Sequence, residues 1–174
     1  ELLLERNYVA GTTAMFRSQF KKILLPFPEV ENNRLKSRMI HDGWIAIMIS
    51  AVAKLDFINE RLVKYRQHPS QQIGASLETI VPSPVSERLA RRDYTDQIEQ
   101  LEFLERALVE RIGEERVFTA LDMVRDKLLH FKTRQEIGGH GVARLPLVLR
   151  ELGALRYHKY SNGFRSALKD LILG

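Results

Sequence analysis

The strongest constraint on the fold lies between residues 94 and 131, where apolar residues recur every three or four positions. This spacing places them on one face of an α-helix. We expect the first series to end at Gly113, since glycine commonly follows a helix, and a second helix to begin just beyond it. Because only a short link joins the two, they are predicted to pair as an antiparallel hairpin. The two faces comprise Tyr94, Ile98, Leu101, Leu104, Leu108 and Ile112, then Val117, Leu121, Val124, Leu128 and Phe131.

The chain changes character near residue 80. Short elements of mixed type alternate with turns in residues 1–80, whereas residues 81–174 have a helical pattern almost throughout. The dividing stretch, VPSPVS, contains two prolines and two serines, which interrupt regular structure. We expect strands at 8–10, 55–58 and 62–65, and a helix that is buried on all sides from Asp42 onward. Two further helices are expected near 145–156 and 162–173. The inward face of the last should comprise Phe164, Leu168, Leu171 and Ile172.

The composition narrows the class of protein. A hydrophobic fraction of 44% is ordinary for a globular protein. The chain has no cysteine, which excludes disulfides, thiolate zinc sites and cysteine nucleophiles and suits a reducing cytoplasm. Its longest apolar run, 45–53, is far shorter than the roughly 20 residues of a transmembrane helix. The chain begins without a methionine or targeting segment, so we expect a piece of a longer protein.

The first candidate functional residue is Asp42, at the expected start of the buried helix. A carboxylate there is stabilised by the helix dipole and by unpaired backbone N–H groups. It could serve simply as the helix cap, which is the commoner role of aspartate at this position. It could also act as a general base that takes a proton from a substrate hydroxyl. One residue can do both.

The second candidate is His68, which ends the motif Tyr65-Arg66-Gln67-His68. Pro69 favours an extended conformation for the histidine and ends the predicted strand. A polar residue in such a place is often simply exposed. Alternatively, His68 could be a metal ligand with a cationic neighbour, Arg66, a setting suited to a diphosphate group.

The order and spacing of these motifs are more specific than either motif alone. The series resembles the second half of bacterial family-2 glycosyltransferases of the GT-A fold, especially those that build rhamnose-containing and other surface polysaccharides. The resemblance covers residues 1–80 closely and 157–170 less specifically. It rests on Asn7-Tyr8-Val9, Gly11-Thr12-Thr13, Met15-Phe16-Arg17, Pro26-x-Pro28, His41-Asp42-x-Trp44, Tyr65-Arg66-Gln67-His68 and Ile73-Gly74-Ala75.

The resemblance implies an α/β fold: the acceptor-side half of a GT-A domain over residues 1–80, followed by a helical extension over 81–174. It implies that Asp42 deprotonates the acceptor hydroxyl in an inverting, in-line displacement. His68 would bind the divalent ion, magnesium or manganese, that bridges the donor phosphates, with Arg66 facing the diphosphate.

The same resemblance implies an acceptor site for a glycan or lipid-linked glycan. Gly11, Thr12 and Thr13 would form its floor, with the glycine allowing close approach of the sugar. Trp44 could offer its ring to a sugar face, or could equally be a core aromatic.

The chain departs from the family in one large respect, because it contains no Asp-x-Asp motif. In the family that motif lies in the half that binds the nucleotide-sugar donor. We therefore expect the donor site to be missing from this chain, and the chain alone to be inactive.

The net charge of +5 is concentrated towards the C-terminus. The basic residues could be a solvated helix face, or could attach the protein peripherally to the anionic inner face of the plasma membrane. Nucleic-acid binding is not expected, since no recognition motif is present. The residues concerned are Arg144, Arg150, Arg156, Lys159, Arg165 and Lys169.

A different class of function is also open. The helical hairpin over 84–135 could dock a partner or a second copy of the chain, giving a homodimer with a degenerate, non-catalytic glycosyltransferase part. Its apolar faces need cover, and the simplest cover is the first part of the chain.

Overall fold

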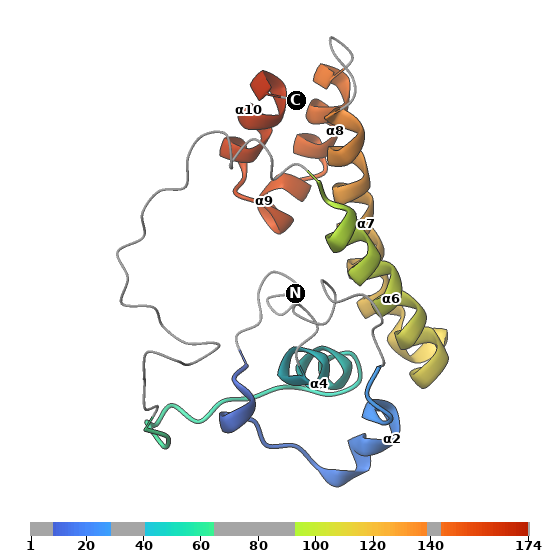
Figure 1. Cartoon of the computed structure of the whole chain (residues 1–174), viewed down its shortest axis with the longest axis vertical. Helices are drawn as coiled ribbons and strands as arrows, with labels where there is room; N and C mark the ends of the chain where they lie inside the picture. Colours follow the sequence, from blue (N-terminus) through green and yellow to red (C-terminus); the bar gives the residue numbers. More distant parts are fainter. Residues whose placement is uncertain (1–8, 29–40, 65–92, 139–143, 174) are drawn as a thin grey trace.

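The computed structural model of the chain describes residues 9–28, 41–64, 93–138 and 144–173. Within these ranges all regular structure is helical (Figure 1). The elements are η1 (Gly11–Thr13), η2 (Ser18–Phe20), α2 (Lys21–Leu24), α4 (His41–Ser50), α6 (Thr95–Ile112), α7 (Glu114–Ile137), α8 (Arg144–Gly153), α9 (Arg156–Tyr160) and α10 (Phe164–Leu173).

The predicted α/β fold is wrong for the part of the chain that the structure describes, because no strand occurs there. Residues 54–64, where two strands were expected, have no regular structure and are exposed. Ala10 has an extended backbone, but it leads into η1, and none of the described residues forms a strand beside it. The physical reason is that strand propensity reflects packing on a sheet, and these segments have no neighbouring strand among the described residues.

The helical hairpin predicted from the apolar spacing is confirmed. Helices α6 and α7 lie side by side along the length of the molecule (Figure 1). Gly113 ends α6 with a φ of 98°, and its N–H donates to the carbonyl of Val109 at 3.0 Å. Such a backbone favours glycine, which explains why the turn occurs at this residue. Helix α7 has a kink at Val117 before it continues to Ile137.

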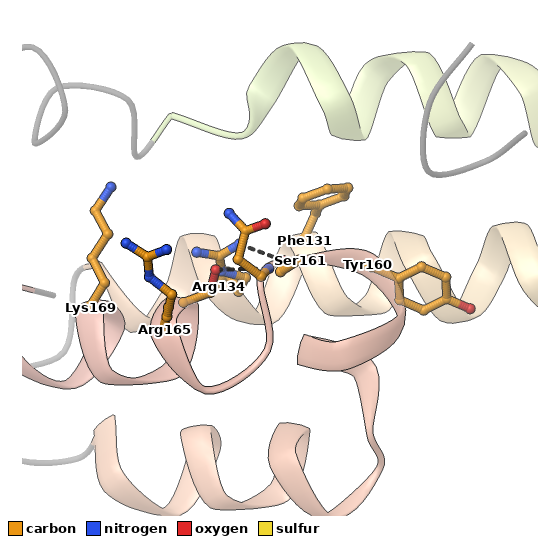
Figure 2. A pocket seen from close by; sticks show the side chains of 8 residues that line it. Phe131, Arg134, Tyr160, Ser161, Arg165 and Lys169 are labelled. Atoms are coloured by element: carbon orange, nitrogen blue, oxygen red, sulfur yellow. Dashed lines mark hydrogen bonds between the residues drawn. The ribbon is translucent and has the colours of Figure 1, made fainter. Parts of the chain in front are cut away.

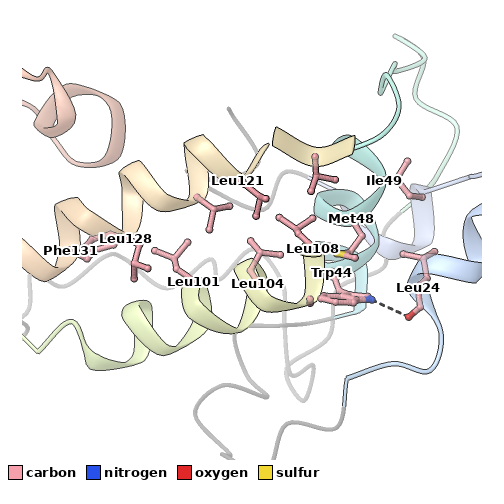
Figure 3. Close-up of a cluster of buried hydrophobic side chains, with 13 residues drawn as sticks. Leu24, Trp44, Met48, Ile49, Leu101, Leu104, Leu108, Leu121, Leu128 and Phe131 are labelled. Atoms are coloured by element: carbon pink, nitrogen blue, oxygen red, sulfur yellow. Dashed lines mark hydrogen bonds between the residues drawn. The ribbon is translucent and has the colours of Figure 1, made fainter. Parts of the chain in front are cut away.

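The main hydrophobic core joins this hairpin to α2 and α4 (Figure 3). Met48 of α4 is fully buried against the hairpin, and Leu24 of α2 is 2% exposed. The expected helix after Asp42 is therefore present, with Ile45 and Ile47 half-buried and its other apolar side chains buried. The hairpin's apolar faces are covered by the first part of the chain, as predicted, so one core takes residues from both sides of residue 80.

A smaller cluster forms at the other end of α7, where α8, α9 and α10 pack against it. It contains four buried apolar side chains: Ile137, Val148, Tyr157 and Ala167. Two further helices had been expected in this tail, and the structure has three, because α9 follows a break at Ala154 and Leu155.

The predicted inward face of α10 is wrong at three of its four residues. Phe164, Leu168 and Ile172 are 71%, 58% and 66% exposed, whereas Leu171 is half-buried against the smaller cluster, as predicted. The helix instead buries Ala167 and Asp170. The reason is that α7 presents polar side chains here, so the side of α10 that carries a carboxylate packs inward and its apolar side remains outside. None of the described helices is both long and apolar enough to cross a bilayer.

Candidate functional site

Asp42 lies in the first turn of α4, where its carboxylate is held by two backbone N–H groups. Oδ1 accepts a hydrogen bond from Gly43 at 2.7 Å, and Oδ2 accepts one from Gly11 at 3.2 Å. The side chain is half-buried. A carboxylate at the N-terminal end of a helix also interacts favourably with the helix dipole. The arrangement fixes the orientation of the carboxylate and joins α4 to η1.

The predicted acceptor residues of η1 therefore lie beside the predicted base, although 31 residues separate Gly11 from Asp42. A Cβ atom at Gly11 would come within 2.8 Å of Nε2 of His41 and 3.5 Å of Cβ of Asp42. A larger residue at position 11 would therefore have to displace the exposed imidazole of His41, whereas the sequence suggested that the glycine allows close approach of a sugar.

Thr12 and Thr13 follow Gly11 and are exposed. The Thr13 hydroxyl donates to the carbonyl of Ala10 at 2.9 Å. Because a hydroxyl oxygen has two lone pairs, Thr13 can still accept a hydrogen bond from a ligand hydroxyl. Together with Asp42, these residues make a small polar surface that combines a fixed carboxylate with exposed hydroxyls.

Trp44 is a core aromatic and has no ring face open to a sugar in this structure. It is 1% exposed, and its Nε1 donates to the carbonyl of Leu24 at 3.2 Å (Figure 3). The guanidinium of Arg111 lies 5.1 Å from the ring centroid, and the ring of Phe103 lies 6.1 Å away. Of the two roles considered for Trp44, the structure supports packing.

The predicted metal ligand His68 and its neighbour Arg66 lie outside the described residues. Among the residues that are described, no group of three or more His, Asp or Glu side chains is arranged to hold a metal ion. The expectation of a divalent ion therefore stays a prediction that depends on His68.

The tail contains a buried polar network that was not predicted from the sequence. Arg134 of α7 is 8% exposed and forms a bidentate ion pair with Asp170 of α10: Nε lies 2.7 Å from Oδ2 and Nη2 lies 3.1 Å from Oδ1. The Tyr157 hydroxyl donates to the same Oδ2 at 2.8 Å. Burial, followed by the hydrogen bond to Asp170, raises the pKa of Tyr157 well above its usual value, so this hydroxyl stays a donor.

A second part of the network surrounds His130, which is fully buried one turn before Arg134. Its Nδ1 lies 2.8 Å from Oε2 of Glu151, and its Nε2 lies 3.0 Å from Oγ of Ser161. Nη1 of Arg156 donates to the other oxygen of Glu151 at 2.9 Å. Burial alone would raise the pKa of Glu151, but the hydrogen bond from His130 and the charge of Arg156 outweigh it and lower that pKa.

The sequence did contain a sign of this network. Glu151 and Asp170 are the only acidic residues between 141 and 174, amid six basic ones. Acidic residues that are isolated in a basic helical region are candidates for buried pairing. His130 and Arg134 stand four residues apart and hence on one helix face, between apolar positions of α7.

A pocket of about 530 Å³ lies beside this network, between α7 and the turn from α9 to α10 (Figure 2). Three cationic side chains line it: Arg134, Arg165 and Lys169. Its remaining polar lining comes from Tyr160, Ser161, Asn162 and Ser166, and Phe131 adds an aromatic edge. The pocket therefore carries positive charge and several hydrogen-bond donors.

Comparison with models of known protein families gave no match, and comparisons with curated proteins and with solved structures gave none either. The similarity to family-2 glycosyltransferases therefore rests on the sequence motifs alone.

Proposed function

We propose that this chain supplies the acceptor-side part of an inverting glycosyltransferase, with Asp42 as the base. One observation carries the proposal: the contact between Gly11 and Asp42, which brings the motif predicted to bind the acceptor next to the residue predicted to deprotonate it. The proposal does not require the α/β architecture, which the described part of the chain lacks. It requires a correctly oriented carboxylate beside a polar surface.

In this proposal the acceptor is a glycan, or a lipid-linked glycan, of a cell-surface polysaccharide. Its hydroxyl approaches the carboxylate of Asp42 from the side of η1. The N–H groups of Gly11 and Gly43 fix the carboxylate, and the exposed Thr12 and Thr13 hydroxyls hydrogen-bond the sugar. Proton transfer to a positioned carboxylate makes the acceptor oxygen a better nucleophile.

The nucleotide-sugar donor would be bound mainly outside this sequence, which has no Asp-x-Asp motif. His68 and Arg66 would face the donor diphosphate. A divalent ion bound through His68 would supply Lewis-acid assistance to the departing nucleoside diphosphate.

The proposal is tested by an Asp42→Asn substitution in the full-length protein. Asparagine keeps the size of the side chain and a carbonyl oxygen, but it cannot take up the proton. We expect transfer to fall by at least ~100-fold with nucleotide-sugar binding nearly intact. Asp56→Asn is the matched control, since the exposed Asp56 makes a similar contact, accepting the N–H of Phe57 at 2.8 Å. Unchanged transfer in the Asp42→Asn protein would remove Asp42 as the base.

Peripheral attachment to an anionic membrane surface is the second part of the proposal. It is supported by the exposed apolar side chains of α8 and α10, which lie among basic residues. Leu145 and Leu149 of α8 are 52% and 56% exposed. Co-sedimentation with vesicles tests it: binding should require anionic lipid, and equal binding to neutral vesicles, or none to either, contradicts it.

The alternative function, a helical docking or dimerisation module, has less support. The apolar faces of the hairpin are occupied by α2 and α4. Light scattering of the purified chain tests this alternative function, because a dimerisation module gives twice the monomer mass at micromolar concentration.

A further inference from the structure

Three side chains of the buried network form a hydrogen-bonded series that ends at the pocket. Oε2 of Glu151 on α8 lies 2.8 Å from Nδ1 of His130 on α7. Nε2 of the same ring lies 3.0 Å from Oγ of Ser161, in the turn between α9 and α10. Glu151 and His130 are fully buried, whereas Ser161 is half-buried and, alone of the three, lines the pocket of about 530 Å³. A small molecule in the pocket therefore meets the serine hydroxyl.

The hydrogen-bond partners of His130 determine which ring nitrogen carries a hydrogen. The pKa of Glu151 is lowered in spite of burial, by the hydrogen bond from His130 and the charge of Arg156, so its carboxylate is ionised and only accepts hydrogen bonds. When His130 is neutral, Nδ1 therefore carries the hydrogen and Nε2 is an acceptor that faces Ser161. The ring of Tyr157 packs edge-on against the imidazole, with 5.0 Å between the centroids. His130 is thus oriented to take the proton of the Ser161 hydroxyl.

Arg134 completes the surroundings of the Ser161 oxygen. Its Nη1 donates to Oγ at 2.8 Å, a bond that Figure 2 marks, while its Nε and Nη2 bind Asp170. A hydroxyl oxygen has one hydrogen and two lone pairs. With the hydrogen directed to His130 and one lone pair to Arg134, the second lone pair has no donor among the described residues. That lone pair is available to attack a molecule in the pocket.

The guanidinium of Arg134 also provides a donor for negative charge that develops beside Ser161. Its Nη1 carries two N–H groups, of which one serves the serine, and none of the described residues accepts the other. Arg134 is 8% exposed, held in place by Asp170, and lines the same pocket. A fixed and largely desolvated donor of this kind stabilises the oxyanion that forms in acyl transfer.

We propose that Ser161, His130 and Glu151 form a catalytic triad that hydrolyses carboxylic esters small enough to enter the pocket. Both distances in the series lie within the range of about 2.6–3.2 Å expected between a nucleophile, its base and the group that orients the base. Ser161 and His130 are catalytic residues because they contact the reacting atoms. Glu151 is a positioning residue, since it acts through the imidazole of His130.

The reaction has two steps and needs only water as the second reactant. In the first, Oγ of Ser161 attacks the ester carbonyl carbon while its proton passes to Nε2 of His130, and the carbonyl oxygen becomes an oxyanion beside Arg134. The bond to the alcohol then breaks, and the alcohol leaves with the proton from His130. In the second, His130 takes a proton from water, which attacks the acyl-serine, and Ser161 recovers its proton as the carboxylic acid leaves.

The first test uses the native whole chain and diisopropyl fluorophosphate, which phosphorylates an activated serine and releases fluoride. We expect one phosphoryl group per chain by mass spectrometry, and peptide mapping should place it on Ser161. The chain should also hydrolyse p-nitrophenyl acetate, followed by the absorbance of the released nitrophenol. No labelling, or labelling at a different residue, overturns the proposal. This result needs no variant, so it decides the matter even if a substitution in the buried network impairs folding.

The second test compares Ser161→Ala with the matched control Ser50→Ala. Ser50 is an exposed serine at the end of α4, and its hydroxyl donates to the carbonyl of Ile47 at 2.8 Å. Ser161→Ala should abolish labelling and lower kcat/KM for the ester by at least ~100-fold, whereas Ser50→Ala should change neither. Circular dichroism checks that each variant is folded. Equal rates in the two variants contradict the proposal.

Glu151→Gln tests the positioning residue. The amide can donate to Nδ1 and so favour the tautomer with its hydrogen on Nε2, which cannot take the serine proton. We expect kcat to fall by at least ~100-fold with KM nearly unchanged, whereas a purely structural role would alter only the unfolding midpoint. Unchanged kcat would remove Glu151 from the triad.

This proposal is independent of the glycosyltransferase proposal. The assays contain no sugar donor, and the Asp42→Asn chain should be labelled as the native chain is. Failure of one proposal therefore leaves the other standing.

Discussion

At the scale of single residues, Glu151 shows how a fully buried carboxylate is made stable. Each of its oxygens has a cationic or hydrogen-bonding partner, His130 on one side and Arg156 on the other. Removing one member of such a set leaves an uncompensated buried group, which costs about 3–5 kcal/mol. The tail helices therefore depend on this network remaining intact as well as on the apolar packing of the smaller cluster.

The lowered pKa of Glu151 makes the stability of the tail depend on pH. The folded state holds this carboxylate ionised below the pKa it has in the unfolded chain, near 4.5. Its contribution is therefore present above about pH 4.5 and is lost as the pH falls through the lower folded value. We expect urea unfolding, followed at several values between about pH 6 and pH 3, to show this loss, and the loss to be smaller in Glu151→Gln.

Glu110→Gln is the control for that experiment, since Glu110 is exposed on α6. It should keep the pH dependence of the native chain. The same pH dependence in Glu151→Gln as in the native protein would show that Glu151 does not contribute.

At the scale of elements, helices α6 and α7 and the turn at Gly113 could be predicted because the apolar spacing and the glycine that specify them lie within the same short stretch of sequence. The buried face of α10 could not be predicted in this way. The orientation of the helix depends on the ion pair between its Asp170 and Arg134 of α7, and these two residues are 36 positions apart in the sequence. Trp44 was equally ambiguous, because sequence alone does not say whether another helix covers it. The pairing of Gly11 with Asp42 was suggested only by the family resemblance, since nothing local connects them.

The glycines at helix ends give a prediction at the same scale. Gly113→Ala should cost about 1–2 kcal/mol, because alanine is strained at a φ of 98° although no atom lies within 4 Å of the new Cβ. Gly153→Ala is the matched control, because a Cβ atom at Gly153 also meets open space, but Gly153 lies within α8 and its φ is not positive. This substitution should raise the free energy of unfolding by up to ~1 kcal/mol. Thermal unfolding measures both, and equal effects would contradict the argument.

At the scale of the whole molecule, the main core depends on α4 as the cover of the hairpin. Met48→Ala should therefore cost about 2–4 kcal/mol, because it leaves a cavity at a fully buried position. Met15→Ala, at a position 95% exposed, should change stability by less than about 0.5 kcal/mol. The fluorescence of Trp44, the single tryptophan, reports unfolding of this core. A small effect of Met48→Ala would mean that the hairpin is stable without α4.

Helix α7 reaches from one hydrophobic cluster to the other, and the two ends differ in chemistry. From Val117 to Phe131 it contributes to a core with thirteen buried apolar side chains among the described residues. Its last turns contribute Ile137 to a cluster with four described ones, and His130 and Arg134 to the charged network. Apolar burial changes the heat capacity on unfolding, whereas the buried, ionised carboxylate of Glu151 makes stability depend on pH. One continuous helix thus joins a cluster whose stability varies mainly with temperature to a network whose stability also varies with acidity, so cooling and acidification weaken the protein at opposite ends of α7.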